Sequence, residues 1–506
     1  VGRYEEGDSY IDIQHRKKWV LYGVVDADLT DTTLVRAGIS HQDTKPRGIT
    51  WGALPTFYSD GSVTDLPRSQ TTAADWTYWN TTNQNIFATV RQEFGDRWNL
   101  TLNYNRLKNT GDTQLLYLYG TVDKDTGTMD GTNPYKSSGQ SIQNSFDAQL
   151  KGLVPLFGRD HEVVLGALHS VLKRHTDNFE APLPWLTDLP VIGQEGVPYP
   201  EPIWGTTPVR NEQERIKQTG YYGAMRLNIA DPLKVILGGR IASWKQTGYA
   251  WGATSDYGDD NVFIPYVGAL YDLTPNHRVY ASYTKIFQPQ NLYDRERRLL
   301  DPLDGNAYEI GLKSSFFGGA LQTSVALFRI EQDNVGQMDG PQIIVDGLLF
   351  QPYRAAAGVV SKGFELEATG QPMPGWNVNA SYSQFKAEDA DDVPANTDQP
   401  RKLLKIFTTY DLGGALDGLT VGGGINYRSK AYSDGANPIT GAAFRFQQDG
   451  YTLVALMARY AVTPQLQLQA NVDNLFDEKF YSNMGSFSQY RYGAPRNFTI
   501  GATYRF

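Results

Sequence analysis

The stretch LQLQANV, residues 466–472, decides the fold. Leu, Leu, Ala and Val alternate in it with Gln, Gln and Asn. Side chains on a β-strand point to opposite faces in turn, so this segment has one apolar and one polar face. The same alternation appears in WNLTLNY at 98–104, in WNVNASY at 376–382 and in the last nine residues, 498–506. The pattern predicts β-strands with one face buried in an apolar environment.

The polar faces of these segments separate a membrane barrel from a soluble sandwich. Both folds give the same period of two, but a sandwich turns its apolar faces inward. Here the polar positions are mostly Asn, Gln, Thr, Ser and Gly, which suits the wall of a hydrated channel. The chain contains no run of about eighteen apolar residues, so a helical membrane protein is excluded. We therefore expect an all-β, transmembrane antiparallel β-barrel.

Turn spacing supports the same fold. Nine short turns are predicted around residues 29–33, 94–97, 156–160, 230–232, 274–276, 317–319, 372–375, 412–418 and 463–465. Long polar connections are predicted at 46–84, 110–139, 178–214, 249–260, 333–351 and 430–447. Short turns at one end and long loops at the other are typical of outer-membrane barrels, with the turns in the periplasm and the loops outside the cell. The count predicts roughly twenty strands in one barrel domain over residues 1–506.

Composition narrows the class of function. The chain has 506 residues, no Cys and a net charge of −9. The absence of Cys excludes disulfides, thiolate zinc sites and cysteine nucleophiles, and the negative charge argues against a nucleic-acid partner. The chain has no GxSxG motif, no HExxH motif and no His pair at helical spacing. We therefore expect neither a catalytic site nor a protein-bound metal.

Several separated motifs resemble the barrel of TonB-dependent ferric-siderophore receptors. They are YTKIFQPQ (283–290), LDPLDG (300–305), YEIGLK (308–313), ALFRIEQDN (326–334), SKGFELE (361–367), NVDNLFD (471–477) and GAPRN (493–497). The segments WGALPTFYSDG (51–61) and DWTYW (75–79) are similar to those of ferric coprogen and ferripyoverdine receptors.

The resemblance implies a bacterial outer-membrane receptor with a barrel of about 22 strands and an N-terminal plug domain. Nothing in residues 1–506 resembles the plug, and we expect the plug and the first two strands to be missing from this chain. The implied partners are a ferric siderophore, outer-membrane lipid and lipopolysaccharide, and TonB through the missing plug. The barrel is expected to be monomeric. Iron would arrive as a finished chelate, so the resemblance implies no cofactor.

A ferric siderophore needs aromatic walls against the chelate faces and a few hydrogen-bond donors toward its oxygens. The resemblance places binding Trp residues on the connection 46–84, which carries Trp51, Tyr58, Trp76 and Trp79. The predicted walls elsewhere are Tyr117, Trp204 and Tyr293, with Tyr119, Tyr249 and Trp251 as further candidates. The predicted donors are Arg295 and Arg354, with Arg297 and Arg298 nearby. Each of these side chains could instead only pack one loop against another.

Two other classes of function stay open at this point. A passive porin shares the architecture but usually has fewer strands and a constriction of opposed acidic and basic residues. A large soluble all-β enzyme, such as a propeller, would need repeats of about forty to fifty residues, which the chain does not contain.

Overall fold

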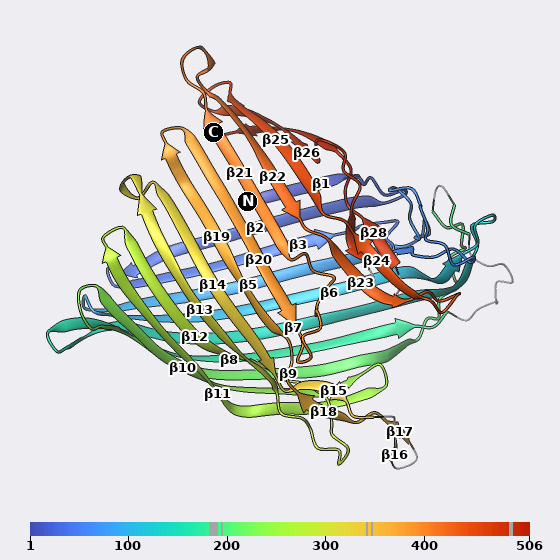
Figure 1. Ribbon diagram of the computed structural model, residues 1–506, viewed down its shortest axis with the longest axis horizontal. Helices are drawn as coiled ribbons and strands as arrows, with labels where there is room; N and C mark the ends of the chain where they lie inside the picture. Colours follow the sequence, from blue (N-terminus) through green and yellow to red (C-terminus); the bar gives the residue numbers. More distant parts are fainter. Residues whose placement is uncertain (182–190, 194–195, 341–342, 346–347, 485–488, 506) are drawn as a thin grey trace.

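The computed structural model describes residues 1–181, 191–193, 196–340, 343–345, 348–484 and 489–505. Twenty strands form one antiparallel sheet in which each strand pairs with the next one along the chain (Figure 1). The first ten are β1 (Gly2–Asp8), β2 (His15–Thr30), β3 (Thr33–Thr44), β5 (Tyr78–Phe94), β6 (Trp98–Val122), β7 (Met129–Leu156), β8 (Arg159–Phe179), β9 (Pro208–Asn228), β10 (Leu233–Ala250) and β11 (Ala253–Thr274). The others are β12 (His277–Gln288), β13 (Leu303–Phe316), β14 (Leu321–Asp333), β19 (Val360–Met373), β20 (Trp376–Glu388), β21 (Lys402–Asp411), β22 (Leu419–Arg428), β25 (Tyr451–Ala461), β26 (Leu466–Asp473) and β29 (Asn497–Tyr504). The predicted strand count is confirmed.

Short turns lie at one end of the sheet, which we call the turn end. All nine predicted turns join consecutive strands there, and two of them contain the short 3-10 helices η1 (Phe317–Gly319) and η2 (Gly414–Leu416). The opposite end, the loop end, carries the longer connections. Four small sheets lie outside the main one: β15 (Val335–Met338) with β18 (Tyr353–Ala356), β16 (Ile343–Val345) with β17 (Leu348–Phe350), β23 (Ala431–Ala436) with β24 (Ala443–Gln448), and β4 (Leu54–Pro55) with β27 (Tyr481–Met484) and β28 (Gln489–Tyr492).

Two of the predicted long connections are wrong. Residues 110–139 belong mostly to β6 and β7, which continue as a paired hairpin as far as Val122 and Met129. Residues 249–260 belong mostly to β10 and β11, which are joined by a tight turn at Trp251 and Gly252. Outside the membrane these hairpins mix polar side chains with buried apolar ones such as Leu115, Leu116 and Leu118. The segments therefore lose the alternation that reveals a strand, while their backbone ladder continues.

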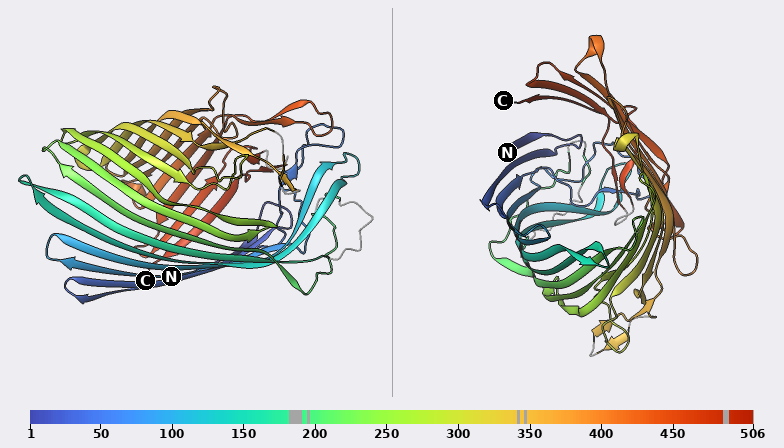
Figure 2. Two further views of the ribbon diagram at one scale, coloured as in Figure 1. Left: turned by 90° about the horizontal axis from the view of Figure 1, so that it is seen from below. Right: turned by 90° about the vertical axis from the view of Figure 1, so that its left-hand side faces the viewer.

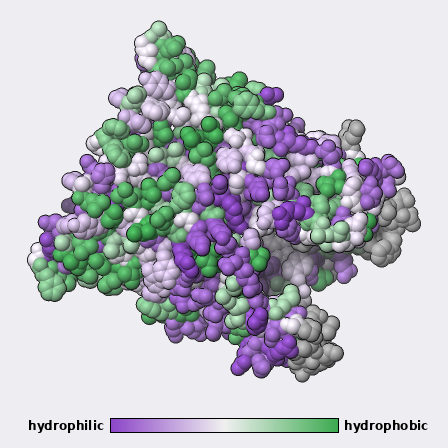
Figure 3. Space-filling view, in the orientation of Figure 1, coloured by the Kyte–Doolittle hydropathy of each residue, from purple (hydrophilic) through white to green (hydrophobic). Residues whose placement is uncertain are grey.

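The apolar face of the sheet points outward. Leu327 on β14 lies opposite Ile310 on β13 and Phe364 on β19, and Leu327 and Ile310 are 55% and 56% exposed. The segment 466–472 on β26 has the same orientation, because Ala470 lies opposite Ala458 and Ile500, and Ile500 is exposed. Apolar colouring covers much of the strand surface in Figure 3, while hydrophilic colouring gathers at the loop end. An apolar face exposed over a whole sheet requires an apolar solvent, which a lipid bilayer supplies.

The opposite face is a polar lumen wall in which side chains bond from strand to strand. Thr89 on β5 donates to Asn103 on β6 (2.8 Å), and the Asn103 amide donates to Asp147 on β7 (3.3 Å). The Tyr222 hydroxyl on β9 also donates to Asp147, at 3.2 Å. These bonds satisfy polar groups across the strands β5 to β9, as buried polar groups require.

The strands curve around this wall into a ring that stays open between β1 and β29 (Figure 2). The right-hand view of Figure 2 looks from the turn end, and the connection 45–77 lies inside the ring. The edges of the sheet are β1 and β29, and the described residues contain no pairing between them. Nowhere in the described ranges is there a helix long and apolar enough to span a membrane.

A buried core holds the loop end together. Leu116, Leu118 and Val122 on β6 pack with Met129 on β7, Ala74, Val197 and Tyr199. This core fixes the extended β6–β7 hairpin against the connection 45–77 and against the segment around Val197 and Tyr199. Burying such side chains contributes about 25 cal/mol per Å² of apolar surface, which offsets the entropy lost by ordering loops.

One buried amide ties three of these segments together. Gln489 on β28 is 5% exposed. Its Oε1 accepts from the backbone N–H of Ala53 at 2.7 Å, and its Nε2 donates to the backbone carbonyl of Leu118 at 2.9 Å. Arg68 and Asp477 add a salt bridge of 2.8 Å between the connections 45–77 and 474–496. Gln489 thereby fixes the backbone beside Trp51, two residues before Ala53.

Replacing Gln489 should loosen the 45–77 connection. Gln489→Leu leaves a buried N–H and a buried carbonyl without partners, at a cost of about 1–3 kcal/mol each. We expect a lower thermal midpoint in detergent and faster proteolysis within 45–77. Gln489→Glu keeps an acceptor for Ala53 but lacks the donor to Leu118 until its carboxyl is protonated, so its stability should recover as the pH falls toward about 4. Equal stability of Gln489→Leu and the unmodified protein would contradict this role.

A tyrosine cluster lies beside Gln489. Tyr490 is fully buried, and it packs with Leu54, Phe446 and Tyr492. The rings of Tyr481 and Tyr492 stack at 5.2 Å, and the Tyr490 hydroxyl lies 3.0 Å from the Thr64 hydroxyl. Burial raises the pKa of Tyr490 well above its ordinary value, and burial raises the pKa of Tyr492 to about 12.

These raised pKa values define the pH range over which the tyrosine cluster stabilises the fold. Both hydroxyls bind their protons more tightly in the folded than in the unfolded chain, so their contribution to stability is complete below about pH 10. It is lost as the pH rises through the folded pKa, near 12 for Tyr492. We expect part of the tyrosinate ultraviolet absorbance to appear only near that pH, and Tyr490→Phe with Tyr492→Phe should reduce that part. Because burial also raises the pKa of Tyr78 to about 12, some late absorbance should remain. A late phase of unchanged amplitude in the double variant would contradict the assignment.

Candidate functional site: an aromatic vestibule at the loop end

The structure brings several of the predicted aromatic side chains together. Trp51 lies against Tyr117 on β6, with ring centroids 5.6 Å apart, and against Tyr135 on β7, at 4.9 Å. Tyr135 in turn lies 6.2 Å from Trp251. Trp79, near the start of β5, is 44% exposed and lines the same cavity as Trp51, Tyr135 and Trp251. We call Trp51, Trp79, Tyr117, Tyr135 and Trp251 the vestibule.

Local backbone geometry positions two of these rings. Trp51 forms an isolated parallel bridge with Tyr117, which continues the β6 ladder into the connection 45–77. Trp251 and Gly252 both have positive φ values, 51° and 82°, as a two-residue hairpin turn with the twist of its strands requires. A left-handed conformation costs about 1–2 kcal/mol at a residue other than Gly, so the extended β10–β11 ladder must hold Trp251 in it.

The vestibule opens on a cavity of about 520 Å³. Polar lumen-wall residues line the rest of this cavity, among them Asn83 on β5, Asn109 on β6 and Ser141 on β7. Its volume lies in the range of small-molecule sites. A ligand would therefore meet aromatic faces on one side and amide and hydroxyl groups on the other.

One ion-pair network borders the cavity. Nε of Arg174 on β8 donates to Glu214 (2.7 Å) and lies 2.8 Å from a carboxylate oxygen of Glu212, both on β9. Gln246 and Ser255 also donate to Glu214, at 2.7 and 3.2 Å. The positive charge of Arg174 is therefore balanced by two carboxylates before any ligand arrives.

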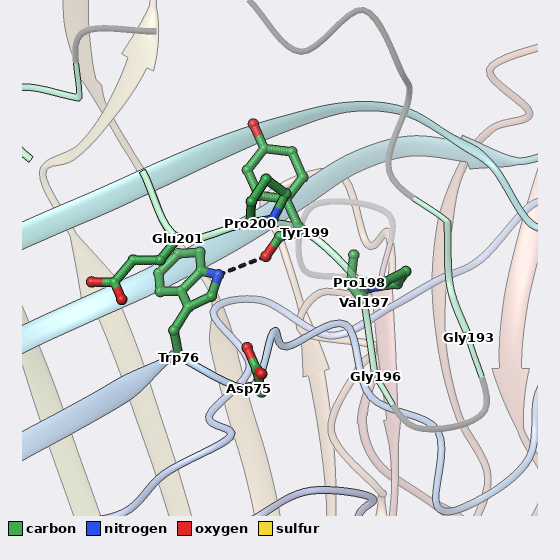
Figure 4. A pocket seen from close by; sticks show the side chains of 9 residues that line it. All are labelled: Asp75, Trp76, Gly193, Gly196, Val197, Pro198, Tyr199, Pro200 and Glu201. Carbon is green, nitrogen blue, oxygen red and sulfur yellow. Dashed lines mark hydrogen bonds between the residues drawn. The ribbon is translucent and has the colours of Figure 1, made fainter. Parts of the chain in front are cut away.

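Trp76 lines a second cavity, of about 980 Å³ (Figure 4), and the ring of Trp204 lies against that of Trp76. The Trp76 indole N–H donates to the carbonyl of Tyr199 at 2.8 Å, and the two Trp rings meet edge to face at 6.1 Å. Trp76 also packs against the loop core, as does Tyr58. The Lys124 ammonium lies 5.3 Å from the ring centroid of Tyr58.

The other predicted residues lie on connections farther along the chain. Tyr293 precedes β13, and its carbonyl accepts from the N–H of Tyr353 at 2.9 Å. Arg295 donates to Asp339 at 2.8 Å, and Arg354 on β18 donates weakly to Gln337 at 3.4 Å. None of these three residues is among those that line the vestibule cavity.

The prediction omitted Tyr135, Arg174 and Glu212. Tyr135 lies in a segment predicted as a loop, so its place on a strand facing Trp51 was hidden. Arg174 and Glu212 are on neighbouring strands, and only the register of β8 with β9 brings them together. The one available signal was the charge pattern around residues 173–177 and 210–215, which a single sequence cannot pair.

Residues 22–475 match the family model described as TonB dependent receptor-like, beta-barrel. The ferripyoverdine receptor of Pseudomonas aeruginosa is 32% identical over all of this chain, and the chain covers 62% of that receptor. The ferrioxamine B receptor of Salmonella typhimurium is 28% identical over 74% of the chain, which covers 52% of that receptor.

Solved structures of receptors are similar to this chain in the same way. The pyoverdine outer membrane receptor of Pseudomonas aeruginosa, bound to pyoverdine, superposes with a TM-score of 0.93 at 32% identity. This chain is covered completely, and it covers 73% of that structure. The chain spans about three fifths of the length of the ferripyoverdine receptor. With its outward apolar face and these relatives, it is a protein of the bacterial outer membrane, and it belongs to the TonB-dependent receptor family, whose β-barrel it forms.

Proposed function

We propose that this chain is the barrel of a receptor that takes up ferric siderophores across the outer membrane, energised through TonB when a plug domain is present. The observation that carries the proposal is the vestibule, an aromatic wall at the loop end above a polar lumen. The relatives named for ferripyoverdine and ferrioxamine B support the same ligand class. Membership of the TonB-dependent family favours active uptake over a passive porin.

The chemistry of the vestibule fits a finished chelate. Iron in a ferric siderophore already has its full set of oxygen ligands, so the receptor needs shape and weak contacts and no coordinating side chains. Trp51, Trp79 and Tyr135 offer flat apolar faces, and Asn83 and Asn109 offer amide donors. Iron accordingly enters as cargo, and we propose no resident cofactor and no catalytic step.

The charge of the site selects among chelates. Three hydroxamate groups cancel the charge of Fe³⁺, whereas a ferric tris-catecholate is a multiply charged anion. Arg174 is already neutralised by Glu212 and Glu214, so the described lining of the vestibule cavity holds no cation without a carboxylate partner. Moving an anion into such a site costs its hydration without a compensating charge. We therefore propose hydroxamate or mixed-ligand siderophores as the substrate class.

The remaining partners follow from the barrel. Its outward apolar wall would contact lipid and lipopolysaccharide, and the plug would connect it to TonB. A net charge of −9 disfavours nucleic acid. Lipid alone can cover the apolar outer wall, so no second copy of the chain is needed to bury it, and we propose a monomer.

Removing the vestibule tryptophans should weaken binding. A ferric trihydroxamate should quench the tryptophan fluorescence of the purified protein in detergent. Trp51→Ala and Trp79→Ala should each raise the dissociation constant roughly tenfold or more, because a buried aromatic contact at the centre of a site carries about 2 kcal/mol. Retention of iron-labelled chelate on a filter gives an affinity that does not depend on the removed fluorophore.

The matched control is Trp376→Ala. Trp376 begins β20 at the turn end, far from the vestibule, and its indole N–H donates to Thr408 at 2.8 Å. This variant should bind the chelate as the unmodified protein does. If Trp51→Ala and Trp79→Ala bind as tightly as Trp376→Ala, the vestibule is not the site.

A further inference from the structure

Basic side chains gather on the outward face of β6 to β10, near the loop end. We call them the basic patch, which consists of Arg106 and Lys108 on β6, Lys173 on β8, Arg215 and Lys217 on β9, and Lys245 on β10. The lumen face of the same strands carries Arg174 and Glu214, which bond to each other. Their chain neighbours Lys173 and Arg215 therefore point away from the lumen, because side chains alternate along a strand.

The basic patch begins where the apolar wall ends. Tyr104 lies opposite Phe146 on the outward face, and Phe146 is 56% exposed. Arg106 and Lys108 follow Tyr104 on the same face, toward the loop end. They lie within about 14 Å of Tyr104 along the strand, because two residues span about 7 Å. Aromatic side chains flank the apolar band of a membrane barrel at the level of the lipid headgroups, so the basic patch faces the headgroup layer.

Strand register places cations of the basic patch directly opposite one another. Lys173 on β8 lies opposite Arg215 on β9. Lys217 on β9 lies opposite Lys245 on β10. Like charges at directly opposed positions destabilise a sheet. Two such pairs side by side are therefore stabilised when an anion binds between them.

The protein supplies little negative charge to the basic patch. Lys245 pairs with Asp256 on β11 at 2.6 Å. In the part of the chain that the structure describes, no carboxylate forms an ion pair with the other Lys residues or with Arg215, that is, with Lys108, Lys173, Lys217 and Arg215. All of these except Lys108 are exposed. Most of the positive charge of the patch is thus open to a partner outside the protein.

A second row of cations shows a different arrangement. Farther round the barrel, Lys362 on β19 lies opposite Arg329 on β14 and Lys386 on β20. Arg329 pairs with Glu331 at 2.6 Å, and Lys386 pairs with Glu388. The protein thus neutralises two of these three cations with its own carboxylates. Opposed cations in this barrel can be balanced internally, and those of the basic patch are largely not.

The position and the charge of the basic patch define its occupant. A phosphate group accepts two parallel bonds from an Arg guanidinium and further bonds from Lys. Lipopolysaccharide, which forms the outer leaflet of the bacterial outer membrane, carries phosphate groups on its lipid A anchor, directly beside the acyl chains. Tyr221 on β9 and Ile241 on β10 are exposed apolar side chains next to the patch, and they offer a surface to those chains. The acyl chains hold the phosphates at the headgroup level, which a free phosphate ion lacks.

We propose that the basic patch binds the phosphate groups of lipid A, with Lys173, Arg215 and Lys217 as the main contacts. The acyl chains of the same lipid lie on the apolar wall beside it. The inference goes beyond siderophore uptake, because the basic patch faces lipid and the vestibule opens on the lumen. It fixes one lipopolysaccharide molecule against the wall formed by β8 to β10.

The test compares lipid A with and without its phosphates. The purified protein is delipidated in a nonionic detergent that contains EDTA, which removes bridging divalent cations. Native mass spectrometry then gives the dissociation constants of diphosphoryl lipid A and of the same lipid after dephosphorylation. Diphosphoryl lipid A should bind roughly tenfold more tightly or better. Inorganic phosphate at the same concentration should not displace it, and its affinity should fall as salt is added, because salt screens exposed charges.

Neutralising the basic patch should remove this preference. Lys173→Gln, Arg215→Gln and Lys217→Gln should each weaken binding of diphosphoryl lipid A roughly fivefold and leave the dephosphorylated lipid unchanged. Lys217→Arg keeps the charge and should bind as the unmodified protein does. The matched control is Lys386→Gln, which removes an outward cation that already has Glu388 as its partner. This control should also bind as the unmodified protein does.

Thermal stability separates a lipid site from a purely structural role. Lys173→Gln removes one member of an opposed pair of cations, so its thermal midpoint without lipid should not fall and should rise at low salt. Diphosphoryl lipid A should raise the thermal midpoint of the unmodified protein more than that of Lys173→Gln, because a ligand that binds only the folded state stabilises it.

Three results would overturn the inference. Equal affinity for lipid A with and without its phosphates would leave only apolar contact with the wall. Equal weakening by Lys386→Gln and Lys217→Gln would show a general attraction to the charged surface. Displacement of lipid A by inorganic phosphate at the same concentration would identify a site for the free ion.

Discussion

Strand pairing in an apolar solvent is the constraint on which this structure depends. A strand in lipid must satisfy every backbone N–H and C=O through its neighbours, because no water is available to do so. It must also present apolar side chains to the lipid at every second position. The strands between the two edges of the twenty-stranded sheet meet both demands, with rows such as Ile310, Leu327 and Phe364 outside and the bonded row of Thr89, Asn103 and Asp147 inside. The polar lumen is therefore a consequence of the same alternation that anchors the wall.

The loop end lies outside the lipid, so this constraint does not apply to it. Its segments are held together by buried side chains, as in a small soluble protein. There the strands β6 to β11 run on into the aqueous phase, and buried clusters around Leu116 and Tyr490 hold the connections together. Gln489 connects the loop-end segments to the barrel strands, because it forms hydrogen bonds with the backbone of the 45–77 connection and with that of β6. Rigid packing around Trp51 gives a preformed aromatic wall, which lowers the ordering cost of binding a ligand. The site is thus placed by soluble-protein packing on a membrane scaffold.

The strands of the barrel could be predicted from the sequence alone, but the full set of residues around the vestibule could not. Alternation in LQLQANV and the short turns are local signals, so the strands, the nine turns and the outward face could all be predicted. Trp51 and Trp79 could be proposed through resemblance. Tyr135 could not, because the outer part of β7 around it is mostly polar and no alternation marks a strand. The pairing of Arg174 with Glu212 and Glu214 depends on the register between two long strands. Such non-local geometry is not encoded in the period of any one segment.

The chain has no native Cys, which permits the most direct test of the central claim. Single cysteines introduced at each position from Leu466 to Val472 can carry a nitroxide, in protein reconstituted in vesicles. The rate at which each nitroxide collides with oxygen, which concentrates in lipid, is then compared with the rate at which it collides with a water-soluble nickel chelate. We expect high accessibility to oxygen at 466, 468, 470 and 472, and high accessibility to the nickel chelate at 467, 469 and 471. The opposite phase, or equal access to the nickel chelate at all seven positions, would contradict an apolar outer wall around a hydrated lumen.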